Sequence, residues 1–276
     1  MENILSQSFL QHAFLAGVLA SIGCGIMGTY VVVKRISFLA GGIAHSILAG
    51  MGIAYYFGGS PIFGAIVSAI VAALIIGWIN LRWREGEDII IAAVWSIGMA
   101  IGVLFIAKTP GYNVDLMSYL FGSILMVSTE ELYIMLLLDI VLLLFVALFY
   151  KQFLAVCFDE EFARLRGVNV ELIYLLLLCL VALTVVLLIQ VVGLILVIAL
   201  LTLPAAIAAQ YRNTLKGIMV LALILGVLFT STGLIVSYEP DLPAGATIIL
   251  IAGSCYILSF AIQRVRKHSH LRKRRA

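Results

Sequence analysis

The stretch LYIMLLLDIVLLLFVALFY, residues 132–150, decides the fold class of this chain. It is apolar throughout apart from Asp139, and its apolar and polar positions do not alternate. A helix needs about 20 mainly apolar residues to cross the hydrocarbon core of a membrane. An outer-membrane strand needs only about 10, and they alternate between apolar and polar. The stretch therefore predicts a membrane-spanning helix.

The rest of the chain has the same character. Of its 276 residues, 64% are hydrophobic and 11% are charged, whereas soluble domains have about 45–50% apolar and about 25% charged residues. We therefore expect an all-α, polytopic membrane bundle of about nine helices, in a single domain over residues 1–276. The predicted spans are residues 9–33, 38–57, 62–81, 89–107, 132–150, 172–189, 192–209, 218–236 and 247–262.

A shorter apolar stretch lies at residues 116–127. It contains Gly122 and two serines, and it is bounded by Asp115 and an acidic cluster at Glu130 and Glu131. A stretch of this length rarely crosses the membrane. We predict a re-entrant or interfacial helix there.

The one sizeable polar loop contains CFDEEFARLRGVN at residues 157–169. Its acidic residues come first and Arg164 and Arg166 come last, which complements a helix dipole. Gly167 is typical of the residue that ends a helix. The pattern predicts a short amphipathic helix with a shape suited to docking in a groove on a soluble partner.

The basic residues are distributed on one side only. All 17 Lys and Arg residues except Lys108 fall on the same side of the predicted bundle. Because basic loops face the cytoplasm, we expect the N-terminus outside and the C-terminus inside. The basic tail, residues 264–276, is interpreted as an anchor on lipid headgroups and not as a nucleic-acid site.

Two ionisable residues lie deep inside predicted spans. His45 follows Gly41 and Gly42 by about one helical turn, and Asp139 is the only acidic residue deep within a span. Such groups are costly in hydrocarbon and tend to face a cavity or pathway, and a neutral imidazole is the commonest metal ligand. Both residues are candidate metal contacts. The alternative for each is a hydrogen-bonded core residue.

A third group of candidates lies on the side opposite the basic residues. Glu239 and Asp241 occur on a short proline-containing loop, and Asp115 falls on the same side. Carboxylates gathered there would raise the local concentration of a divalent cation. The alternative is an ordinary solvated rim.

Five motifs in order give the chain a resemblance to a known family. They are YVVVKRISF at 30–38 leading into GGIAH at 41–45, LMSYLFGSI at 116–124, FDEEFARLRGV at 158–168, VGLILVIALLTLPAA at 192–206 and SYEPDLPAGAT at 237–247. On these motifs the chain resembles the permease subunits of the ABC-3 family, the bacterial zinc and manganese importers. The resemblance covers essentially the whole chain.

The resemblance implies a location, partners and a cargo. Two copies would pair as a homodimer in the bacterial inner membrane, two ATP-binding cassette subunits would clamp the short cytoplasmic helix, and an extracytoplasmic binding protein would deliver zinc or manganese. No resident cofactor and no enzyme activity are expected in this chain. The residues expected to couple to the ATPase are Phe158, Asp159, Glu160, Glu161, Arg164 and Gly167.

One position departs from the family pattern. Members often carry an aspartate four residues before the histidine, and that position is Gly41 here. The departure removes an oxygen ligand and leaves an imidazole. Since manganese prefers carboxylates and zinc favours nitrogen and sulfur ligands, we expect zinc first and manganese second.

Two other functions fit the sequence less well. An ion-coupled secondary transporter often has repeated halves and several intramembrane charges, but the chain shows no convincing repeat and has only Asp139 as a charge deep in a span. An intramembrane metalloprotease needs a paired-ligand motif such as H-E-x-x-H, which His45 does not belong to. The chain also lacks a Gly-rich phosphate loop ending in Gly-Lys-Ser/Thr, so ATP hydrolysis is expected in another chain.

The distribution of basic residues yields a topology prediction. Single cysteines placed at Asn3 and at Ala276, in a background without the native cysteines, are treated with a membrane-impermeant thiol reagent on intact cells. We expect labelling at position 3 only, because basic segments stay in the cytoplasm. Labelling at position 276 alone would contradict the predicted orientation.

Overall fold

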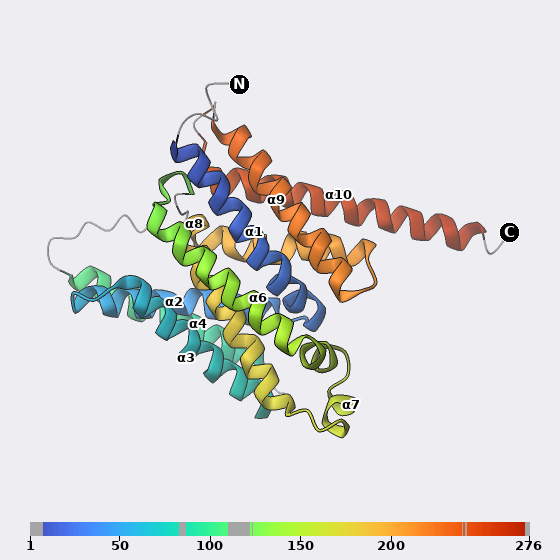
Figure 1. The fold of residues 1–276 in the computed structure, drawn as a ribbon, viewed down its shortest axis with the longest axis horizontal. Coiled ribbons are helices and arrows are strands. Elements are labelled where there is room, and N and C mark those ends of the chain that lie inside the picture. The colour runs from blue at the N-terminus through green and yellow to red at the C-terminus, as the bar shows by residue number, and fades with distance from the viewer. Residues whose placement is uncertain are drawn as a thin grey trace.

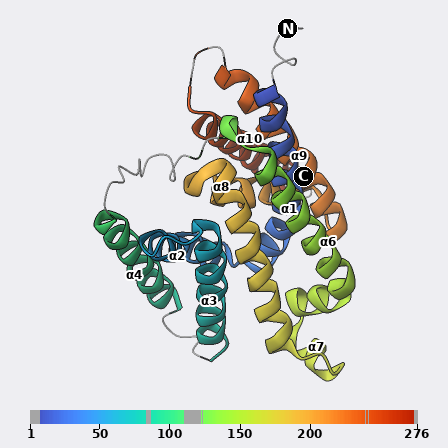
Figure 2. The same cartoon turned by 60° about the vertical axis from the view of Figure 1, so that its left-hand side comes forward.

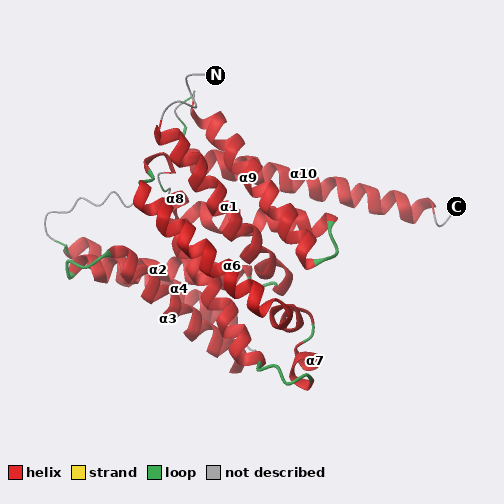
Figure 3. Ribbon diagram, viewed as in Figure 1, coloured by secondary structure: helices red, strands yellow, loops and turns green. Residues whose placement is uncertain are grey.

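The computed structural model describes residues 8–82, 87–109, 122, 124–238, 240 and 242–273. Every regular element in this part of the chain is a helix (Figure 3). The elements are α1 (Ser8–Lys34), α2 (Ser37–Tyr56), α3 (Pro61–Arg82), α4 (Glu87–Lys108), η1 (Ile124–Met126), α6 (Thr129–Phe158), α7 (Glu160–Leu165), α8 (Val170–Tyr211), α9 (Leu215–Tyr238) and α10 (Ala244–Lys273).

The predicted all-α membrane bundle is confirmed. Nine helical segments of the described residues, with α8 counted as two, are long and apolar enough to span a membrane. Several helices are longer than their predicted spans, because apolar residues mark only the part within hydrocarbon. In α6, for example, a capping box at Ser128 and Glu131 starts the helix, and the Glu131 carboxylate accepts from the Ser128 N–H at 2.8 Å.

The two spans predicted at 172–189 and 192–209 form one element, α8, which is broken at Gly193. This glycine has φ 72° and ψ 167°, a backbone conformation that residues other than glycine rarely adopt. Gly122, also at positive φ, lies so close that a Cβ there would overlap the Gly193 nitrogen. Of the predicted re-entrant helix, residues 116–121 and 123 lie outside the described residues. Ile124–Met126 forms the 3₁₀ turn η1.

Helix α8 lies at the centre of the arrangement. It contacts α1, α2, α3, α6, α9 and α10, and its side chains at Leu177, Leu178 and Leu188 are fully buried. Helices α2, α3 and α4 form a group on one side of it, while α1, α6 and α9 lie on the other (Figures 1 and 2). The bundle therefore has two groups of helices joined through α8.

Small residues set the distances between helices. A Cβ at Gly50 of α2 would overlap the Gly64 carbonyl oxygen of α3, and a Cβ at Gly28 of α1 would overlap the Leu201 carbonyl oxygen of α8. In lipid there is no hydrophobic force between helices, so close van der Waals contact at small residues has to hold them together.

The basic ends of several helices meet at one end of the bundle. The Lys216 ammonium at the start of α9 lies 5.1 Å from the centroid of the Tyr150 ring, next to Lys151 in α6. The Lys34 ammonium at the end of α1 donates to the Val156 carbonyl, also in α6, at 2.8 Å. This agrees with the one-sided distribution in the sequence. That this end faces the cytoplasm stays a prediction.

The close approach at Gly28 can be tested against a matched glycine. We expect Gly28→Ala to lower the melting temperature of the detergent-solubilised protein by roughly 3–10 °C, because the methyl group forces α1 away from α8. Gly253→Ala in α10 is the control, since a Cβ there meets no atom within 4 Å. Equal melting temperatures for the two variants would contradict the packing.

Candidate metal site and coupling segment

His45 lies in α2 with its imidazole stacked on the indole of Trp95 in α4. The ring centroids are 4.0 Å apart and the ring planes differ by 7°. The indole N–H of Trp95 donates in turn to the sulfur of Met99, one turn later in α4, at 3.1 Å. One face of the imidazole is therefore held by a ring whose own position is fixed.

The backbones of α2 and α4 approach closely on either side of this stack. A Cβ at Gly98 would lie 2.8 Å from the Cα of Ser46, and a Cβ at Gly42 would lie 2.5 Å from a methyl carbon of Ile91. The Ser46 hydroxyl donates to the Gly42 carbonyl at 2.8 Å, within its own helix. The polar group next to His45 is thus satisfied without the imidazole.

The Nδ1 atom of His45 is buried and has no hydrogen-bond partner in the described part of the chain. A buried polar atom without a partner costs about 1–3 kcal/mol. His45 as a whole residue is half-buried. Because a neutral imidazole nitrogen is the commonest metal ligand, His45 stays a candidate metal contact.

Gly41 leaves space on the same face of α2. A Cβ there would meet only the δ-methyl of Ile198 in α8, at an ordinary contact distance of 3.5 Å. Residues four apart on a helix lie on one face, so a side chain at position 41 would extend beside His45. An added Cβ is accommodated at Gly41, in contrast to Gly42.

Asp139 in α6 is also buried. It is 2% exposed, and neither carboxylate oxygen has a hydrogen bond within the described residues. It faces α1 and α8, since a Cβ at Gly23 would lie 3.1 Å from its Oδ1 and 3.3 Å from the γ-methyl of Thr184. His45 faces α4 instead. The described residues contain no group of three or more His, Cys, Asp and Glu side chains that could hold a metal ion.

The short helix predicted in the polar loop is present as α7, with the predicted start and stop. Asp159 caps it, because its carboxylate accepts from the Phe162 N–H at 2.9 Å. Gly167 has φ 78°. Its N–H donates to Arg164 O at 3.0 Å, and the Val168 N–H donates to Ala163 O at 3.1 Å. These two bonds form a Schellman motif, in which glycine suits the left-handed position.

The predicted coupling segment, residues 157–169, hereafter called the coupling segment, presents apolar side chains at its surface. Phe158 is 65% exposed, Phe162 is 52% exposed and Leu165 is 86% exposed, whereas Ala163 is fully buried. Figure 1 shows α7 at the end of the bundle far from the N-terminus. Exposed aromatic and aliphatic side chains on a short helix are typical of a docking surface.

Sequence reasoning missed two residues at these sites, Lys34 and Trp95. Lys34 forms an ion pair with Glu160 of the coupling segment, and Trp95 stacks on His45. Each contact joins helices that are distant in sequence, so no local pattern predicts it. The proposed outer residues Asp115, Glu239 and Asp241 lie outside the described residues.

Comparisons with known proteins assign the family. A model of the ABC 3 transport family matches residues 6–263. A probable metal transport system membrane protein of Chlamydia trachomatis is 43% identical over 273 residues, covering 96% of this chain and 93% of the relative. The manganese transport system membrane protein MntC of Halalkalibacterium halodurans is 34% identical over 259 residues, covering 94% and 89%.

A solved structure agrees with these relatives. PsaBC from Streptococcus pneumoniae, in complex with Fab, is similar with a TM-score of 0.85 and 32% identity, covering 94% of this chain and 93% of that one. The chain belongs to the ABC 3 transport family. It is therefore a multi-pass membrane permease subunit and not an enzyme.

Proposed function

We propose that the chain is the permease subunit of an ATP-driven importer for divalent transition metal ions, with residues 1–276 as a single permease domain. The family and the metal-transport names of its relatives support this class. The observation that carries the proposal is His45, an imidazole deep in a span with a buried nitrogen that has no partner in the described part of the chain.

The proposed assembly is a homodimer in the bacterial inner membrane, with two ATP-binding cassette subunits and an extracytoplasmic binding protein. The exposed apolar side chains of the coupling segment suit docking to a cytoplasmic subunit. With the basic end in the cytoplasm, the sequence predicts the acidic residues Asp115, Glu239 and Asp241 on the side of delivery. Family membership favours this assembly over an ion-coupled secondary transporter.

The imidazole of His45 binds the ion in passing and then releases it. A structural zinc site has four protein ligands and holds its ion tightly. One nitrogen from each copy gives a weaker site, which suits an ion that must move on. Asp139 is the second proposed contact, because its buried carboxylate also lacks a partner in the described residues.

Zinc is the first proposed cargo and manganese the second. Gly41 supplies no oxygen ligand beside His45, and imidazole is a preferred ligand of zinc. Manganese is favoured by a different observation, the manganese-transport name of a relative that covers 94% of this chain. Measuring the uptake of zinc and of manganese by the same reconstituted complex shows which of the two ions is the preferred cargo.

The proposed site predicts a specific loss of transport. In proteoliposomes that contain the complete complex, we expect His45→Ala to reduce uptake of radiolabelled zinc by at least about tenfold, because a metal ligand is lost. Assembly with the ATPase should persist. His12→Ala, in the N-terminal part of α1, is the matched control and should transport like the parent. Parent-level zinc and manganese uptake by His45→Ala would reject the site.

The space beside Gly41 predicts a change of selectivity. We expect Gly41→Asp to raise the ratio of manganese to zinc uptake by about fivefold or more, because the added carboxylate is a ligand that manganese prefers. Gly41→Ala fills part of the same space without an oxygen atom and should leave the ratio unchanged. The same change of ratio in both variants would assign the effect to bulk and not to the ligand.

A further inference from the structure

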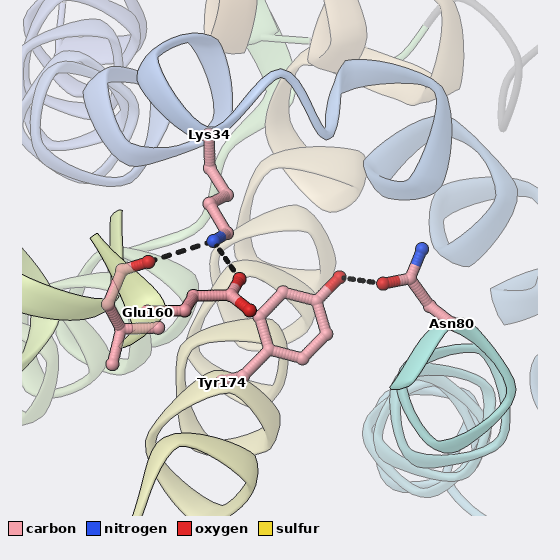
Figure 4. Close-up of polar contacts among 5 residues, drawn as sticks. Lys34, Asn80, Glu160 and Tyr174 are labelled. Carbon is pink, nitrogen blue, oxygen red and sulfur yellow. Dashed lines mark hydrogen bonds and ion pairs between the residues drawn. The ribbon is translucent and has the colours of Figure 1, made fainter. Parts of the chain in front are cut away.

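Lys34, the last residue of α1, is held by three groups from three other elements. Its ammonium forms an ion pair with the Glu160 carboxylate of α7 and donates to the Val156 carbonyl of α6 at 2.8 Å. It also lies 5.9 Å from the centroid of the Tyr174 ring in α8. Figure 4 shows the lysine side chain reaching into this junction. The C-terminal end of α1 is therefore joined to the coupling segment by an ion pair.

The junction extends to a further helix. The hydroxyl of Tyr174 donates to the side-chain oxygen of Asn80 in α3 at 3.0 Å. Tyr174 itself is 3% exposed, so its ring is part of the core. Polar contacts therefore connect the group of α2, α3 and α4 with the coupling segment at this end of the bundle (Figure 4).

The three acidic residues of the coupling segment have different surroundings. Asp159 caps α7, and Glu161 is exposed. Glu160 is turned toward the bundle, where its side chain is 32% exposed and that of Lys34 is 15% exposed. Charges that are partly removed from water need a partner, so the two side chains hold each other in place.

Lys34 is also adjacent to the helix that carries His45. Arg35, at φ 62°, and Ile36 form a tight turn, with Arg35 N–H donating to Val32 O at 3.2 Å and Ile36 N–H donating to Val31 O at 3.0 Å. This is a Schellman motif with arginine where glycine is usual. His45 follows in α2, about 12 Å along the helix from its first residue. Because this turn is short and hydrogen-bonded, a displacement of Lys34 also displaces the start of α2.

From these contacts we propose that Lys34 is a positioning residue of the transport cycle, which transmits displacement of the coupling segment to the junction of α1 and α2 and so to His45. The inference rests on the proposed function, in which an ATPase moves the coupling segment. A polar contact suits this role, because it holds a defined geometry and can break and re-form.

The test uses the complete reconstituted complex, with Lys34→Gln and Glu160→Gln made singly and together. The measurement is the ratio of ATP hydrolysis with metal-loaded binding protein to hydrolysis without it, for zinc and manganese in parallel. We expect each single variant to lower this ratio by about fivefold or more, as is typical of coupling between sites. The double variant should be no worse than the singles, because the same contact is lost.

Two controls separate transmission from structural support. Lys34→Arg keeps the charge and the hydrogen bonds and should restore at least half of the parent stimulation. Lys151→Gln removes an exposed lysine of α6 near the same end and should behave like the parent. Melting temperatures of all complexes are measured alongside, since a merely structural role lowers stability while the assembled fraction keeps its stimulation ratio.

The outcomes distinguish this inference from the proposed function. If the parent complex shows neither metal-stimulated hydrolysis nor uptake, the proposed function fails and the inference fails with it. If the parent is stimulated and the assembled single variants are stimulated equally, the inference alone is overturned. If Lys34→Gln does not assemble, Glu160→Gln decides, because it abolishes the ion pair while the Lys34 ammonium keeps its hydrogen bond to the Val156 carbonyl.

Discussion

The proposed transport site depends on one constraint: the buried Nδ1 of His45 has no hydrogen-bond partner among the described residues. Around His45, the backbones of α2 and α4 are in close contact. The indole of Trp95 stacks on the imidazole. No polar group among the described residues forms a hydrogen bond with Nδ1. Such an atom costs about 1–3 kcal/mol. A stable bundle retains that cost where function requires it. In the proposed function, a passing metal ion is the partner that offsets it.

In the proposed function, the same bundle links the site in the membrane to an ATPase subunit outside it. Helix α2 carries His45 and is continuous, through a tight turn, with the end of α1. Lys34 fastens that end to Glu160, and the coupling segment exposes Phe162 and Leu165 on its outer surface. Contacts at small residues, such as that of Gly28 with Leu201, keep α1 tight against α8. Closely packed interiors transmit strain. In the proposed mechanism, displacement of the coupling segment therefore shifts the junction of α1 and α2.

Much of the fold could be predicted from the sequence because its signals are local. The apolar stretch at 132–150 marks α6, and the acidic start and glycine stop of residues 159–167 mark α7 with its ends. The extra length of α6 comes from a polar cap that hydropathy does not register. The break in α8 was predicted as two spans, although its cause is one backbone conformation at Gly193.

The candidate site was less predictable because its contacts are distant in sequence. His45 is visible as a histidine inside a span, but its stack on Trp95 depends on how α2 and α4 pack. Lys34 and Glu160 are 126 positions apart, so neither residue alone indicates the pair. The depth of Asp139 was predicted, whereas its neighbours Gly23 and Thr184 were not. The preferred metal depends on ligands that one sequence does not place together.

The most direct test of the central claim is X-ray absorption at the zinc edge of the assembled, zinc-loaded complex held without ATP hydrolysis. With His45 as a metal ligand, we expect outer-shell scattering from imidazole in the parent, and loss of that scattering in His45→Gln under the same loading. An identical imidazole signal in the two complexes would contradict the account, because the ion would then bind elsewhere.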